Sequence, residues 1–121
     1  MSKSYSTLAL ALVWVLAGTS SAAAHAFPDQ AEPRVGAVLT EPPQEVKIWF
    51  SEELEPAFST VRVLNDTGTT VDQGNGKVTE EDPHLLQVDL LPLPQGVYTV
   101  EWNVLSVDGH RTEGRFTFTV R

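Results

Sequence analysis

Apolar residues occupy every second position in four segments of the chain, 46–50, 86–90, 98–104 and 116–120. Side chains of a β-strand point alternately to its two faces, so this period of two predicts strands with one buried face. Residues 58–64 are rich in apolar and β-branched side chains and predict another strand. Beyond the N-terminal segment, no stretch has the spacing of three and four that indicates an amphipathic helix. The pattern indicates an all-β chain.

Turn-forming residues separate these segments at short intervals. Gly, Pro, Asn and Asp cluster at 32–33, 41–43, 65–68, 74–76, 82–83, 92–96 and 108–109. Roughly six to eight short strands in one domain of this size predict an antiparallel β-sandwich or a small barrel. We favour the sandwich, with the polar interval 66–83 as a loop that holds a weak strand near 70–71.

The first 24 residues have the three parts of a secretory signal peptide. Lys3 supplies the positive charge, residues 8–17 supply about ten apolar positions, and residues 19–24 are small and end in an Ala-x-Ala pattern. A membrane span needs about 20 apolar residues, so we expect cleavage after residue 24 rather than a retained anchor. The predicted product is an exported, periplasmic domain, residues 25–121, that does not insert into a membrane. Cleavage after Ala26 is the competing prediction.

Charge and composition narrow the partners of this domain. Residues 25–121 carry 7 basic and 16 acidic side chains, a net charge of about −9 with His neutral. Nucleic acid is not expected as a partner, because phosphate binding uses clustered Lys and Arg, whereas a negative domain attracts cations. The chain has no Cys, and its one Met lies in the signal segment, so the domain lacks the soft ligands that select Cu(I).

Two histidines and an aspartate are the most informative polar residues. If cleavage follows residue 24, His25 begins the domain and offers its α-amine and its imidazole to one metal ion. Asp108 and His110 are two positions apart, a spacing that points both side chains the same way in an extended chain. Either the strand continues and buries this pair, or Gly109 breaks the register and leaves the pair at the rim. Taken alone, an Asp-Gly pair is more often a plain turn.

The order of several short sequence motifs resembles that of the CopC family of periplasmic copper-binding, copper-resistance proteins, over essentially the whole predicted domain. The motifs are HA at 25–26, IWFSE at 48–52, EPAFS at 55–59, GVYTVEW at 96–102, SVDGH at 106–110 and GRFTFTV at 114–120. The resemblance implies an immunoglobulin-like Greek-key sandwich or barrel that binds one Cu(II) ion per chain. It also implies a CopD-like membrane copper transporter as the partner.

The resemblance implies a ligand set as well. The family's ligands correspond to the amine and imidazole of His25, to Asp108 and to His110, and a nearby acidic position corresponds to Glu52 as ligand or supporting residue. Some relatives hold Cu(I) in a methionine-rich loop, but the corresponding region here, about 74–86, has no Met. His84 is interpreted as an exposed loop residue, with metal capture as the alternative.

The residue types agree with this assignment on chemical grounds. Cu(II) favours nitrogen and oxygen ligands in a tetragonal arrangement, and zinc is the second choice of metal. A free α-amine has a pKa of about 7.7–8.0 and binds metal only when deprotonated, so affinity is expected to fall on acidification. We therefore expect Cu(II) to be retained and Cu(I) to be held weakly.

Two other functions stay open at this point. An N-terminal His with a second His also forms the copper brace of lytic polysaccharide monooxygenases, although 97 residues leave little room for a substrate surface. A metal-free immunoglobulin-like interaction module is the other alternative. The chain has no nucleophile paired with a base and no phosphate-binding glycine loop before a helix, so we predict a copper-binding protein for sequestration, resistance or delivery, and not an enzyme.

Overall fold

The structure, a computed structural model, describes residues 26–121. The predicted signal segment and His25 lie outside the described residues. The secondary structure consists of short strands and one short helix: β1 (Pro28–Glu32), β2 (Val38–Leu39), β3 (Glu45–Phe50), the 3-10 helix η1 (Pro56–Phe58), β4 (Thr60–Leu64), β5 (Lys77–Val78), β6 (Leu85–Asp89), β7 (Gly96–Leu105) and β8 (Arg111–Val120). Within this part of the chain, no helix is long and apolar enough to cross a membrane.

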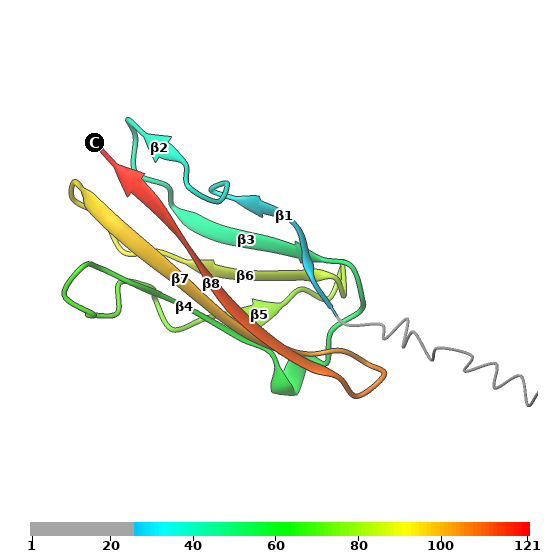
Figure 1. The fold of residues 1–121 in the computed structure, drawn as a ribbon. Coiled ribbons are helices and arrows are strands. Elements are labelled where there is room, and N and C mark those ends of the chain that lie inside the picture. Colours follow the sequence, from blue (N-terminus) through cyan, green and yellow to red (C-terminus); the bar gives the residue numbers. More distant parts are fainter. Residues whose placement is uncertain (1–25) are drawn as a thin grey trace, which may run out of the picture.

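The strands form two four-stranded sheets that pack face to face (Figure 1). The first sheet has the order β1-β3-β6-β5 and the second has the order β2-β8-β7-β4. All neighbouring strands are antiparallel except β2 and β8, which run parallel. The chain changes sheet at every connection from β1 to β5 and again from β6 to β7, as in a Greek-key sandwich. The all-β, immunoglobulin-like sandwich predicted from the sequence is confirmed.

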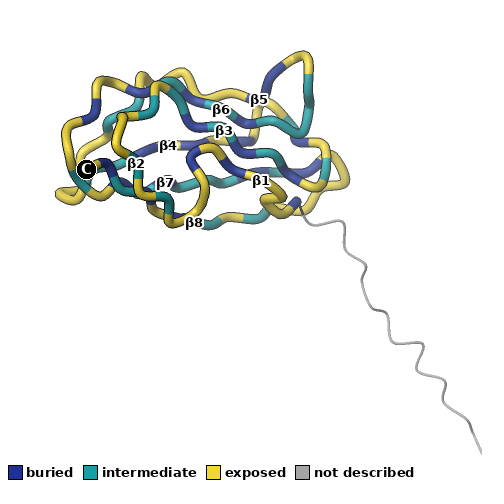
Figure 2. The backbone as a smooth tube through the Cα atoms, turned by 90° about the horizontal axis from the view of Figure 1, so that it is seen from above, coloured by how far each residue is buried: buried dark blue, intermediate teal, exposed yellow. Residues whose placement is uncertain are grey.

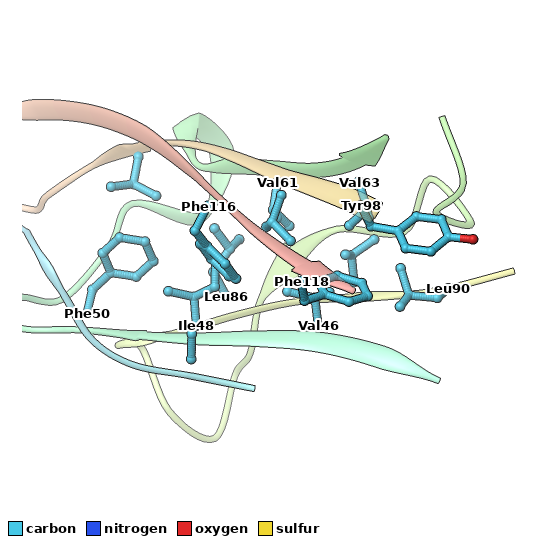
Figure 3. Packing of buried hydrophobic residues seen from close by; sticks show 14 of the residues in the cluster. Val46, Ile48, Phe50, Val61, Val63, Leu86, Leu90, Tyr98, Phe116 and Phe118 are labelled. Carbon is cyan, nitrogen blue, oxygen red and sulfur yellow. The ribbon is translucent and has the colours of Figure 1, made fainter. Parts of the chain in front are cut away.

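The core lies between the sheets and is built from the alternating apolar positions (Figure 3). In β3 every second residue is buried, and β6 shows the same alternation, so both strands turn one face inward. The longest pair, β7 and β8, aligns residues 96–105 with 111–120. The rings of Tyr98 and Phe118 stack with centroids 5.4 Å apart inside this pair. The outer faces of both sheets stay largely half-buried or exposed (Figure 2).

Two local predictions need correction, and three strands are additional to those predicted. Phe58 was expected in a strand, but it belongs to η1 and its side chain is 56% exposed. The weak strand near residue 70 is only an isolated bridge between Leu64 and Thr70, while the interval also contains β5. The short strands β1 and β2 were not predicted, because their sequences show no apolar alternation.

One end of the sandwich gathers the residues of interest. There β3 ends, β6 begins, and the turn 106–110 joins β7 to β8. Figure 1 shows this turn, in orange, at the same end as η1 and as the point where the described chain begins. We call this region the turn end; the opposite region, where β7 begins and β8 finishes, is the Tyr98 end.

Candidate metal site

The turn 106–110 settles which register the Asp108 and His110 pair follows. The strand β7 stops at Leu105, and Gly109 adopts a left-handed conformation with φ of 92°. Its amide donates to the Ser106 carbonyl at 2.9 Å, and the Ser106 amide donates to the His110 carbonyl at 2.9 Å. Gly109 thus breaks the register and leaves the pair at the rim, which was one of the two alternatives considered from the sequence. The side chains are 36% exposed for Asp108 and 48% exposed for His110.

Asp108 and His110 face each other within this turn. The distance from the carboxylate Oδ1 to the imidazole Nδ1 is 3.2 Å. The Ser106 hydroxyl donates to the same carboxylate oxygen, and the Ser106 side chain is itself buried, with 1% exposure. This hydroxyl lowers the pKa of Asp108 below its ordinary value, the His110 contacts lower it further, and partial desolvation opposes them. The turn therefore presents an ionised carboxylate beside an imidazole.

The segment after β3 packs against this turn. The Val107 amide donates to the Glu53 carbonyl at 3.0 Å, and the Glu55 amide donates to the Leu105 carbonyl at 2.8 Å. Between them, the fully buried Leu54 forms an antiparallel bridge with Ser106. These bonds place the half-buried Glu52 at the turn end as well. Among residues 26–121, however, no three His, Cys, Asp or Glu side chains gather closely enough to hold a metal ion.

The start of the described chain is fixed at the same end. Ala26 is fully buried, and its carbonyl accepts a 2.7 Å hydrogen bond from the hydroxyl of Thr112 on β8. The Phe27 amide donates to the Ser51 hydroxyl at 3.0 Å, and the Ser51 amide donates to the Phe27 carbonyl at 2.8 Å. Ala26, the residue that follows His25, is therefore bonded to Thr112, which lies two positions after His110 in the chain.

His84 also lies at the turn end but is engaged in the fold. It is half-buried, which corrects the expectation of an exposed loop residue. Its Nδ1 atom lies 3.0 Å from the Phe50 carbonyl oxygen. Because a carbonyl only accepts, Nδ1 carries the hydrogen, and the imidazole thereby extends the pairing of β3 with the start of β6.

Three hydroxyl residues at this end were not predicted from the sequence to have a role. They are Ser51, Ser106 and Thr112. One signal was available for Ser106, because it continues the buried even-numbered positions of β7 with a polar side chain. No sequence signal connects Thr112 to Ala26, which are 86 positions apart.

Comparison with known proteins connects this fold to a family. A model of the CopC domain matches residues 29–121. Protein YobA of Escherichia coli (strain K12) is 37% identical over 114 residues, covering 93% of this chain and 92% of YobA. The copper transport protein CutJ of Bacillus subtilis is 34% identical over 98 residues, covering 80% of this chain but 18% of CutJ.

A solved structure gives the same result. The crystal structure of CopC from Methylosinus trichosporium OB3b superposes with a TM-score of 0.70 at 35% identity, covering 79% of this chain and 93% of that one. The family model spans all eight strands except the first residue of β1, so the match extends over the whole sandwich. The chain belongs to the CopC domain family.

Proposed function

We propose that this protein is exported to the periplasm, binds one Cu(II) ion at the turn end, and sequesters it or passes it to a membrane transporter without catalytic turnover. The observation that carries the proposal is the rim pair of Asp108 and His110 in a CopC domain whose first described residue, Ala26, is bonded to Thr112, two positions after His110. Relatives tied to copper transport by name support the choice of metal.

The spacing within the rim pair suits two ligands of one ion. Oxygen and nitrogen ligands lie about 2.0–2.2 Å from a divalent transition metal. Two such atoms at neighbouring corners of a square are therefore about 3 Å apart, close to the 3.2 Å between Asp108 Oδ1 and His110 Nδ1. We assign these two atoms as ligands, and the α-amine and imidazole of His25 as the other two.

An alternative arrangement of the same pair can be distinguished. Histidines that bind metals commonly donate their second ring N–H to a carboxylate. In that arrangement His110 binds through Nε2, and Asp108 only orients the ring. Pulsed electron paramagnetic resonance separates the two, because it reports the chemical environment of the remote ring nitrogen. We propose Glu52 as a weak additional ligand or as a carboxylate that supports the others.

Charge and ligand chemistry support retention of Cu(II). A net charge of about −9 draws cations toward the domain. Residues 25–121 contain neither Cys nor Met, so Cu(I) finds only the harder nitrogen and oxygen ligands. We expect reduction to weaken copper binding and to favour release.

The proposed delivery to a transporter is supported by a relative in which a similar domain is part of a longer protein. The match to CutJ covers 18% of a longer protein named for copper transport, so a related domain occurs in one chain with other segments of a transport protein. A separate domain of the same kind is suited to pass its ion to a CopD-like membrane partner. Loading such a partner from the copper-bound domain, compared with the same amount of unbound copper, tests this step.

The decisive experiment measures the first residue and the copper ligands on one sample. Mass spectrometry of the exported protein should show a chain that begins at His25, and electron paramagnetic resonance should show three nitrogens around Cu(II). Acetylation of the His25 α-amine should lower the affinity by at least about 100-fold, because it removes one of the two nitrogens of the proposed chelate. An unchanged affinity and spectrum in the acetylated protein would overturn the proposed ligand set.

A further inference from the structure

Two hydroxyl side chains hold the start of the domain against the rest of the turn end. The Thr112 hydroxyl donates to the Ala26 carbonyl at 2.7 Å, and the Ser51 hydroxyl accepts from the Phe27 amide at 3.0 Å. Thr112 belongs to β8 in one sheet, and Ser51 follows β3 in the other. Ala26 and Phe27, the two residues that follow His25, are thus bound from both sheets of the sandwich.

The Thr112 bond joins the chain start to the region of His110. His110 directly precedes β8, and Thr112 is the second residue of that strand. Ala26, whose carbonyl Thr112 holds, directly follows His25 in the sequence. The bond therefore connects two residues that each lie within two positions of a proposed ligand.

Because the Ala26 carbonyl is buried, the loss of its hydrogen bond from Thr112 is costly. Ala26 is fully buried, and a buried carbonyl that loses its donor is destabilised because water cannot replace the bond. Without the hydroxyl, the Ala26 carbonyl regains a hydrogen bond only if Ala26 moves away from Thr112 and into water. Ser51 differs in that its amide also donates to the Phe27 carbonyl, so its hydroxyl is a second contact on a segment already paired.

We infer that Thr112, assisted by Ser51, is a positioning residue for copper: its hydroxyl fixes Ala26, the residue that follows the proposed ligand His25, at the turn end before the ion arrives. The inference rests on the proposed function, because it requires His25 as a ligand. Neither hydroxyl is itself a ligand. Pre-positioning raises affinity by removing the freedom that the chain start otherwise loses on binding.

The test compares Thr112→Val, which removes the hydroxyl at nearly constant shape, with Thr112→Ser, which keeps it. Both are made in the exported protein whose first residue has been verified as His25. The Val variant should bind Cu(II) about tenfold more weakly, within the range found for residues that support metal ligands, and should show a mixture of spectra with fewer bound nitrogens. The Ser variant should retain most of the affinity and the single spectrum.

Matched controls keep the outcome specific. Thr117→Val makes the same change at an exposed position of the same strand and should leave affinity and spectrum unchanged. Ser51→Ala should weaken binding less than Thr112→Val, and the double variant should weaken it more than either. Hydrogen exchange at Ala26 and Phe27 in the copper-free protein should quicken in Thr112→Val.

Each result has a definite meaning. The inference is overturned if Thr112→Val keeps the affinity and spectrum of the parent, or if the Ser and Val variants lose affinity equally. His25→Ala separates this from a failure of the proposed function: if that change leaves Cu(II) binding intact, the ligand set is wrong. If His25→Ala abolishes the parent's spectrum and Thr112→Val does not alter it, only the positioning role fails.

Discussion

The two ends of the sandwich use hydroxyl groups for different purposes. At the Tyr98 end, the Tyr98 hydroxyl donates to the Pro94 carbonyl at 2.5 Å, and its ring is 2% exposed and stacked on Phe118. At the turn end, the Ser106 hydroxyl donates to the exposed carboxylate of Asp108, and the Thr112 hydroxyl donates to the carbonyl of Ala26. One end uses the bond to fasten apolar packing, and the other uses it to fix polar groups that stay accessible.

This difference separates stability from function along the molecule. Large buried rings contribute most of the free energy of folding, because they remove the largest apolar area from water. Exposed side chains such as His110 contribute little to folding, so substitutions there are expected to change the stability of the fold only slightly. Substitutions at the Tyr98 end should therefore lower the stability of the fold, and substitutions at the turn end should lower the affinity for copper.

The largest effect is expected at the Tyr98 end. Phe118→Ala removes a fully buried ring that stacks on Tyr98 and should destabilise the fold by about 3–5 kcal/mol. Chemical denaturation of the copper-free protein measures the loss. Copper affinity of the remaining folded protein should be unchanged, and a parallel fall in affinity would contradict the separation of the two ends.

The reverse outcome is expected for His110. His110→Ala removes one proposed nitrogen ligand and should lower Cu(II) affinity at least about 100-fold, beyond the loss typical of supporting residues. Because the side chain is 48% exposed, the copper-free stability should change by less than about 0.5 kcal/mol. Competition titration gives the affinity. His84→Ala is the matched control, since its imidazole is bonded to the Phe50 carbonyl and is not a proposed ligand.

Ser106 is expected to contribute both to the stability of the fold and to copper binding. Ser106→Ala removes a buried hydroxyl that donates to Asp108 and accepts from the His110 amide at 3.3 Å. Loss of these bonds should cost about 1–3 kcal/mol of stability and weaken Cu(II) binding about tenfold. Thermal denaturation and copper titration of the same variant test both effects. A stability loss with an unchanged affinity would restrict Ser106 to the fold alone.

Tyr98→Phe should have a smaller effect, confined to stability. Removing the hydroxyl leaves the Pro94 carbonyl without its donor and should cost about 1 kcal/mol, with copper affinity unchanged. Burial, aided by the charge of Asp66, raises the pKa of Tyr98 above 10.0, so the folded state disfavours the ionised ring. The parent should accordingly lose stability as pH rises past about 10, and this part of the loss should be absent in Tyr98→Phe.

The smallest effect is a shift in one titration. The Ser106 hydroxyl lowers the pKa of Asp108, so the carboxylate stabilises the folded state above its ordinary pKa and loses this contribution as pH falls through the lowered value. Ser106→Ala should move the Asp108 titration upward toward 3.8, measured by carboxyl-carbon NMR of the copper-free protein. An unmoved titration would show that the hydroxyl does not hold this carboxylate.

The candidate ligands of the site can be predicted from the sequence, but the residues that hold the surrounding backbone in place cannot. Asp108 and His110 were identified because their spacing and types are local properties of five consecutive residues. The sequence alone does not decide whether they continue the strand, and the left-handed conformation of Gly109 does. Thr112 went unnoticed because a Thr in a strand is ordinary, and its role depends on a carbonyl 86 positions away.

The sequence by itself determined the segments of β3, β4, β6, β7 and β8, the all-β class, the negative charge and the absence of Cys and Met from residues 25–121. Each depends on residue types or on neighbours within a few positions, where the period of two is visible directly. Only the tertiary structure decided the pairing of β1 with β3, the exposed rim position of Asp108 and His110, and the bonds from both sheets to Ala26 and Phe27. Such contacts join distant segments, so they depend on how the two sheets pack and not on any local pattern.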